Sequence, residues 1–125
     1  MVEHPFPTKK NITIKNSDGN NIVIKCEYAK TTNEQMTGVL GMDDMCPNCG
    51  ILFNVKPSSY YHMNGVKFPL DMIFCDKKGK ILSTITTQPD GDNVYPPKGS
   101  FFNIEVNGGF CNEHNIRKGD NLYIS

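Results

Sequence analysis

The stretch NITIKNSDGNNIVIKCEYA, residues 11–29, decides the fold class of this chain. Its isoleucines stand two positions apart in both halves, and polar residues surround them. Such an alternation is typical of a β-strand with one buried face. The Asp18-Gly19 pair between the halves suits the positive φ angles of a tight turn. The stretch therefore predicts a β-hairpin.

The periodicity changes directly after the hairpin, in TTNEQMTGVLG (residues 31–41). Thr31 and Glu34 have the spacing of a capping box, which marks the start of a helix. The segment predicts a short helix that Gly41 ends and that packs one apolar face on a sheet. We expect three residues at helical spacing to form this face: Met36, Val39 and Leu40.

The rest of the chain predicts mostly strands. The segment 108–116 fits one helical turn, and the proline-containing segment 87–99 predicts a surface loop. Eight short strands with one or two short helices indicate an all-β, jelly-roll-like sandwich or barrel. We expect residues 11–125 to form this domain and the polar residues 1–10 to form a loose N-terminal arm. The six strands expected after the helix are GILFNV (50–55), SYYHM (59–63), MIFCD (72–76), KILSTIT (80–86), SFFNIEV (100–106) and the end of RKGDNLYIS (117–125).

Composition restricts the possible partners. The 125 residues include 13 Lys and Arg against 13 Asp and Glu, so the net charge is zero. This balance argues against electrostatic capture of nucleic acid or of an anionic membrane. No apolar run approaches the ~20 residues of a membrane-spanning helix. The start of the chain has no leader pattern, so we expect a cytoplasmic protein, or a virion protein if the source is viral.

Seven short motifs stand in a fixed order along the chain: AKT (29–31), GVLG (38–41), GILF (50–53), YHMN (61–64), PLD (69–71), EVNGG (105–109) and GD (119–120). In this order they resemble the domain of unknown function 192 (DUF192) family. The resemblance implies a compact jelly-roll-like β-sandwich and no particular reaction, because the role of that family is unassigned. Family members usually carry a tryptophan before Met63, whereas this chain has none, so a ligand site there would have changed shape.

The cysteines raise the question of a metal. Cys46 and Cys49 have Cys-x-x-Cys spacing, and Cys111 and His114 have Cys-x-x-His spacing. Together they form a possible three-cysteine, one-histidine zinc site, since structural zinc takes four ligands. A redox pair usually lies at the N-terminus of a helix, whereas Cys46 and Cys49 precede a predicted strand. We expect two reduced thiols in a loop, with zinc as the alternative.

The segment YYHMNGVKFPLD (60–71) holds the predicted ligand-binding residues. Alternation places Tyr60, His62 and Asn64 on one face, where they could bind a polar ligand together with Asp71. The alternative is an exposed polar face, with Asp71 accepting backbone N–H bonds that fix a turn. An acid–base pair of His62 and Asp71 would indicate an enzyme.

No motif for nucleotide binding and no catalytic combination of residues stands out in the chain. We therefore expect a non-enzymatic interaction or structural module that needs no cofactor. Its partner would be another protein or further copies of itself, as in an accessory or decoration subunit of a virus-like particle. The alternative is a small-ligand-binding or zinc-binding domain, and an enzyme ranks last.

Overall fold

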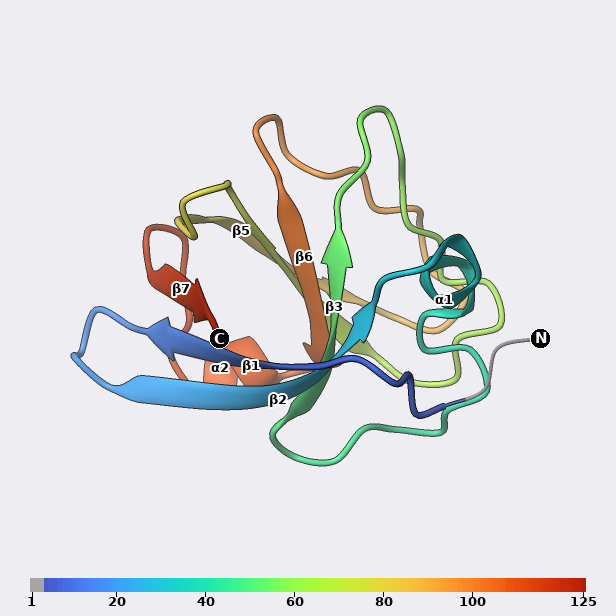
Figure 1. The fold of residues 1–125 in the computed structure, drawn as a ribbon, viewed down its shortest axis with the longest axis horizontal. Coiled ribbons are helices and arrows are strands. Elements are labelled where there is room, and N and C mark those ends of the chain that lie inside the picture. The colour runs from blue at the N-terminus through green and yellow to red at the C-terminus, as the bar shows by residue number, and fades with distance from the viewer. Residues whose placement is uncertain (1–3) are drawn as a thin grey trace.

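The structure, a computed structural model, describes residues 4–125 and is mostly β with two short helices (Figure 1). The mainly β prediction is confirmed. Neither helix is long enough to cross a lipid bilayer. The strands are β1 (Lys9–Lys15), β2 (Asn21–Ala29), β3 (Cys49–Asn54), β4 (Leu70–Cys75), β5 (Ile81–Thr87), β6 (Phe102–Asn107) and β7 (Asn121–Ile124), and the helices are α1 (Thr32–Thr37) and α2 (Phe110–Glu113).

The seven strands form one curled sheet in the order β5-β4-β6-β3-β2-β1-β7. All neighbours are antiparallel except β2 and β3, which run parallel. The residues at the two edges meet, because Lys80 bridges Asn121 and the Leu122 amide donates to the Gly79 carbonyl at 2.8 Å. A Cβ at Gly79 would lie 2.0 Å from the Leu122 oxygen, so this approach requires glycine.

The predicted hairpin is confirmed as β1 and β2, paired in register from Lys9 and Glu27 to Lys15 and Asn21. Its turn is fixed by the buried Asn16. The Asn16 Oδ1 accepts the amides of Asp18 and Asn20, and its Nδ2 donates to the His114 carbonyl at 3.0 Å. The hairpin turn is thereby tied to the end of α2.

Each face of the sheet carries its own apolar core. The inner core draws on all seven strands and on α2. The outer core lies under α1 and the loops that Figure 1 shows gathered at one side of the sheet. The inner core includes Ile12, Ile14, Ile24, Leu52, Ile73, Cys75, Ile104, Val106, Phe110, Cys111 and Leu122. The outer core includes Phe6, Ala29, Val39, Met45, Ile51, Phe53, Met63, Val66, Phe68, Leu70, Met72, Phe74 and Val94.

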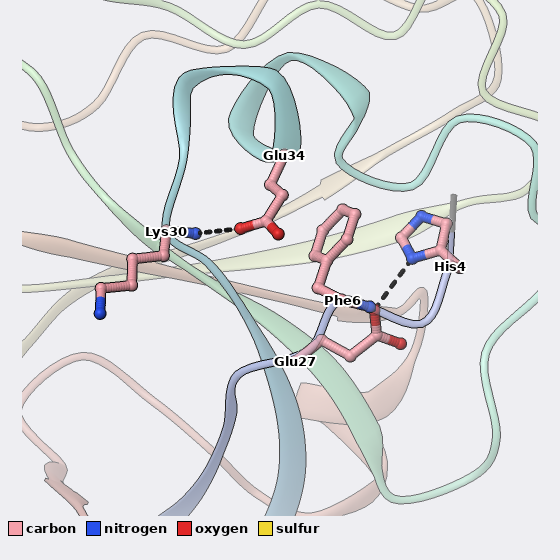
Figure 2. Close-up of polar contacts among 5 residues, drawn as sticks. All are labelled: His4, Phe6, Glu27, Lys30 and Glu34. Carbon is pink, nitrogen blue, oxygen red and sulfur yellow. Dashed lines mark hydrogen bonds and ion pairs between the residues drawn. The ribbon is translucent and has the colours of Figure 1, made fainter. Parts of the chain in front are cut away.

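Helix α1 begins as predicted but ends earlier. The Thr31 Oγ1 accepts the Glu34 amide at 3.1 Å, and Glu34 Oε1 accepts the Thr31 amide, which completes the capping box. Glu34 Oε1 also accepts the Lys30 amide (Figure 2). The helix stops at Gly38, whose φ of 47° breaks the helical path. The Met36 side chain is 72 % exposed, so its expected place in the apolar face is wrong.

Two further expectations differ from the structure. Residues 59–63 form a loop with a single bridge between Tyr61 and Val94, because no neighbouring strand runs alongside it. The described part of the expected loose arm is anchored. Phe6 is fully buried, and its amide donates to Glu27 Oε1 at 2.6 Å (Figure 2). Residues 1–3 lie outside the described residues.

Candidate functional site

A cavity of about 380 Å³ opens on the outer face of the sheet, beside α1. Volumes of this size are typical of small-ligand sites. The walls come from α1 and the turn after it, the end of β3, the loop before β4, and β4 itself. The apolar lining residues are Met36, Val39, Leu40, Phe53, Val66, Leu70 and Met72, and the polar or amphipathic ones include Gln35, Asn54, Lys56, Tyr60, Tyr61, His62 and Glu105.

Glu105 is the buried acidic residue of the cavity. It lies on β6, a central strand, between Ile51 of β3 and Met72 of β4 in the register of the sheet. Its side chain is on the outer face, because its neighbours Ile104 and Val106 belong to the inner core. Only 4 % of the residue is exposed, although it lines the cavity. An apolar sheet face therefore presents one carboxyl group to the cavity.

The environment of Glu105 disfavours its charged form. Burial raises the pKa of Glu105 from 4.5 to about 7, and the hydrogen bond from Asn103 only partly opposes that rise. Among the described residues, no cation pairs with this carboxylate. A buried carboxyl with a strongly raised pKa in a cavity is a frequent feature of functional sites.

Asn103 and Tyr61 complete a buried polar cluster with Glu105. Asn103 is fully buried, and within residues 4–125 its Oδ1 has no hydrogen-bond partner. Burial raises the pKa of Tyr61 to about 12, the nearby Asn103 side chain lowers it, and the charge of Glu105 raises it further. The Tyr61 ring packs edge-on against Phe53 at 5.9 Å. The cluster thus has unused hydrogen-bonding capacity within an aromatic shell.

The mouth of the cavity is aromatic and exposed. Tyr60 is 54 % exposed, and its ring lies 5.6 Å from that of Tyr95. Met36 stands on the α1 side of the same opening, and His62 is an exposed part of the lining. A molecule that enters the cavity would pass these exposed side chains on its way to Glu105.

The DUF192 family model, described as "Uncharacterized ACR", matches residues 13–124. The chain belongs to the DUF192 family. A crystal structure from Sinorhizobium meliloti, described as a "putative transcription regulator", is similar to this chain at 20% identity and a TM-score of 0.85, with 97% of each chain covered. A protein of unknown function from Novosphingobium aromaticivorans is similar at 22% identity and a TM-score of 0.84, covering 98% of this chain and 91% of its own. No curated protein matches.

The structure separates the predicted ligand-binding residues of this DUF192 protein. Tyr60 and His62 line the cavity, whereas Asn64 is exposed and lies outside the lining. Asp71 lies on the inner face, where it accepts the Cys111 amide at 2.9 Å and the Thr86 hydroxyl at 2.7 Å. Asp71 therefore holds α2 in place, and the structure does not bring it together with His62 as an acid–base pair.

The predicted zinc ligands are not gathered either. Cys111 is buried in the inner core, and the His114 ring lies 4.3 Å from that of Phe110. Cys46 and Cys49 form a disulfide, so the prediction of reduced thiols is wrong. A turn in which the Cys49 amide donates to the Cys46 carbonyl brings their Cα atoms to 5.1 Å, within the usual range for a disulfide. Across residues 4–125, no three His, Cys, Asp or Glu side chains are grouped as metal ligands.

The buried cluster was not predicted from the sequence. The segment SFFNIEV was predicted as a strand, which β6 confirms, but no site was expected at Asn103 and Glu105. In the structure β6 lies between β4 and β3 and is covered on both faces, so these polar residues are buried. The signal available in the sequence was Glu105 itself, an acidic residue between the β-branched apolar residues Ile104 and Val106.

Proposed function

We propose that this DUF192 protein binds a small organic ligand in the cavity beside α1. The supporting observation is the buried Glu105, which faces the cavity without a cationic partner among the described residues. A buried carboxyl destabilises a fold unless it is neutral or paired, so its place in a lined cavity is consistent with a ligand that completes it.

The walls also favour a ligand with an apolar part. Phe53, Leu70 and Met72 cover the path between the exposed mouth and Glu105 with carbon surface. Pockets of this kind bind through apolar contact and take their specificity from a few polar groups. This observation favours the small-ligand alternative over the structural-module hypothesis. The jelly-roll-like particle subunit and the zinc-binding domain remain predictions without such support.

A screen of small organic fragments by ligand-observed NMR tests the proposal. We expect hits whose binding shifts the amide signals of α1, the end of β3 and residues 60–62. Met36→Trp, which places an indole ring at the mouth, should weaken these hits. Val23→Trp is the matched control, because Val23 is also exposed but lies outside the cavity lining. Hits that bind elsewhere, or equally well to Met36→Trp, would contradict the proposal.

A further inference from the structure

We propose that the ligand is a primary alkylamine in its protonated form, whose ammonium group pairs with the Glu105 carboxylate while its chain lies against Phe53, Leu70 and Met72. This inference rests on the proposed function and assigns the chemical class of the ligand. It rests on three features of the cavity: a buried carboxyl that receives only one long hydrogen bond from the described residues, an apolar wall, and too few ligands for a metal.

Few hydrogen-bond donors reach the Glu105 carboxyl at the inner end of the cavity. Glu105 Oε2 receives one long hydrogen bond from Asn103 Nδ2 at 3.4 Å, and no other described side chain donates to the carboxyl. The Asn103 Oδ1, two residues away on β6 and outside the cavity lining, is a second buried acceptor without a partner in the described residues. An ammonium group has three N–H donors and a positive charge, so it supplies what this cluster lacks.

The remaining lining argues for an alkyl chain and against a metal. Between the mouth and Glu105, the apolar wall offers no second carboxylate, and no group of metal ligands is present in residues 4–125. Mg²⁺ and Ca²⁺ need several oxygen ligands, whereas an ammonium ion needs one carboxylate and apolar surroundings for its chain.

Proton release should accompany binding. In the protein without ligand, a large fraction of Glu105 is protonated at neutral pH, because burial raises the pKa of this carboxyl to about 7. The other titratable groups that line the cavity are Tyr61 beside Glu105 and the outer residues Lys56, Tyr60 and His62. When an ammonium group enters, Glu105 ionises: RNH3⁺ and the carboxylic acid give the ion pair and one H⁺. A neutral ligand would give no such release.

Calorimetric titration near neutral pH with n-hexylamine and n-hexanol tests this inference. We expect the amine to bind more tightly, and measurements in buffers of different ionisation enthalpy should show proton release that fades above the pKa of Glu105. Glu105→Gln should weaken amine binding by about tenfold to a hundredfold, the effect of losing one charged hydrogen bond, and should abolish the proton release. Glu113→Gln, the same change at an exposed residue of α2, should alter neither.

The outcomes distinguish the two proposals. Equal binding of n-hexanol and n-hexylamine, insensitive to Glu105→Gln, would overturn the amine inference and leave the small-ligand cavity standing. Failure of both probes and of every fragment in the screen would overturn the proposed function as well. The proton release of the unmodified protein is a readout that does not depend on the folding of any variant.

Discussion

Asn103 and Glu105 stand two residues apart on β6 and share a hydrogen bond, from Nδ2 to Oε2, at 3.4 Å. The period of a strand places both on one face, and β3 and β4 enclose them there. Asn103 lies opposite Phe53 and Phe74 in the register. A single long bond stabilises a buried carboxylate poorly, so it only partly offsets burial, which raises the pKa of Glu105 to about 7.

The first prediction concerns stability against pH. Because the pKa of folded Glu105 is about 7 and its ordinary value is 4.5, the folded chain binds more protons than the unfolded chain between these values. The contribution of Glu105 is therefore full below about pH 4.5 and is lost as the pH rises to about 7. The free energy of unfolding of Glu105→Gln, minus that of the unmodified protein, should therefore increase by on the order of 3 kcal/mol as the pH rises through this window.

Urea unfolding at a series of pH values measures this difference. The comparison cancels the other titrating groups, since they are common to both proteins. Glu113→Gln removes an exposed carboxyl and should show a nearly flat difference across the same window. If the difference for Glu105→Gln is also flat, the pKa of Glu105 is not raised in the folded protein, and the unusual environment of this carboxyl is refuted.

The second prediction concerns Asp71. Asp71→Asn replaces an oxygen that accepts the Cys111 amide or the Thr86 hydroxyl by a donor, so it should lower the free energy of unfolding by about 1–3 kcal/mol. Because Asp71 faces the inner core, ligand binding by the folded variant should not change. Asp43→Asn is the control, since Asp43 is exposed and, within residues 4–125, pairs only with Lys67 at 3.4 Å. A stable variant that loses ligand binding would restore the ligand role expected for Asp71.

The local pattern of the sequence predicted most strands but not what covers them. Period two and the Asp18-Gly19 turn suffice for the β1–β2 hairpin, and Thr31 with Glu34 suffices for the start of α1. The order of the strands decides which face of each strand meets solvent. That order depends on pairings between segments far apart in the chain, so a local pattern does not reveal it. The central place of β6 therefore buries Glu105, and the absence of an adjoining strand leaves residues 59–63 as a loop.

Only the residues at the mouth of the cavity could be predicted from the sequence, because the order of the strands decides which other residues reach it. Tyr60 and His62 line the cavity, but so does Tyr61, because residues 59–63 form a loop without the expected alternation. Asp71, although close in sequence, lies in β4 on the opposite face. Because His62 and Asp71 are close in sequence, they were expected in one site, but the sheet places them on opposite faces. The pairing of Cys46 with Cys49 depends on a local turn and on oxidation state, and spacing alone does not distinguish a disulfide from two thiols.

The third prediction concerns the cysteines. Of the five cysteines, the structure leaves Cys26, Cys75 and Cys111 free and buried. Burial raises the thiol pKa of both Cys26 and Cys75 to about 12, and it raises that of Cys111 as well. Iodoacetamide should therefore modify no cysteine of the folded, oxidised protein, two after mild reduction, and all five after reduction and unfolding.

Mass spectrometry of the alkylated protein gives these counts. The disulfide closes a loop of sequence separation 3, so its reduction should cost only about 2 kcal/mol of stability and leave the chain folded. If two cysteines are modified before reduction, Cys46 and Cys49 are reduced thiols and not a disulfide. In that case, zinc analysis of reduced protein tests the remaining alternative, and one zinc per chain, lost in Cys46→Ser, would support it.

The last prediction concerns the segment expected to be loose. Phe6 fills part of the outer core, and the Glu27 carboxylate fixes its backbone while also contacting His4 Nδ1 at 2.9 Å (Figure 2). Removing a fully buried aromatic ring leaves a cavity, so Phe6→Ala should lower the free energy of unfolding by about 3–5 kcal/mol.

Urea unfolding monitored by circular dichroism measures this loss. Phe101→Ala is the matched control, because the Phe101 ring is exposed and packs mainly on its neighbour Phe102, so its removal should cost much less. Equal effects of the two substitutions would mean that residues 4–8 contribute nothing to the outer core. A large effect confined to Phe6→Ala would show that this segment covers the sheet beside α1 and belongs to the folded domain.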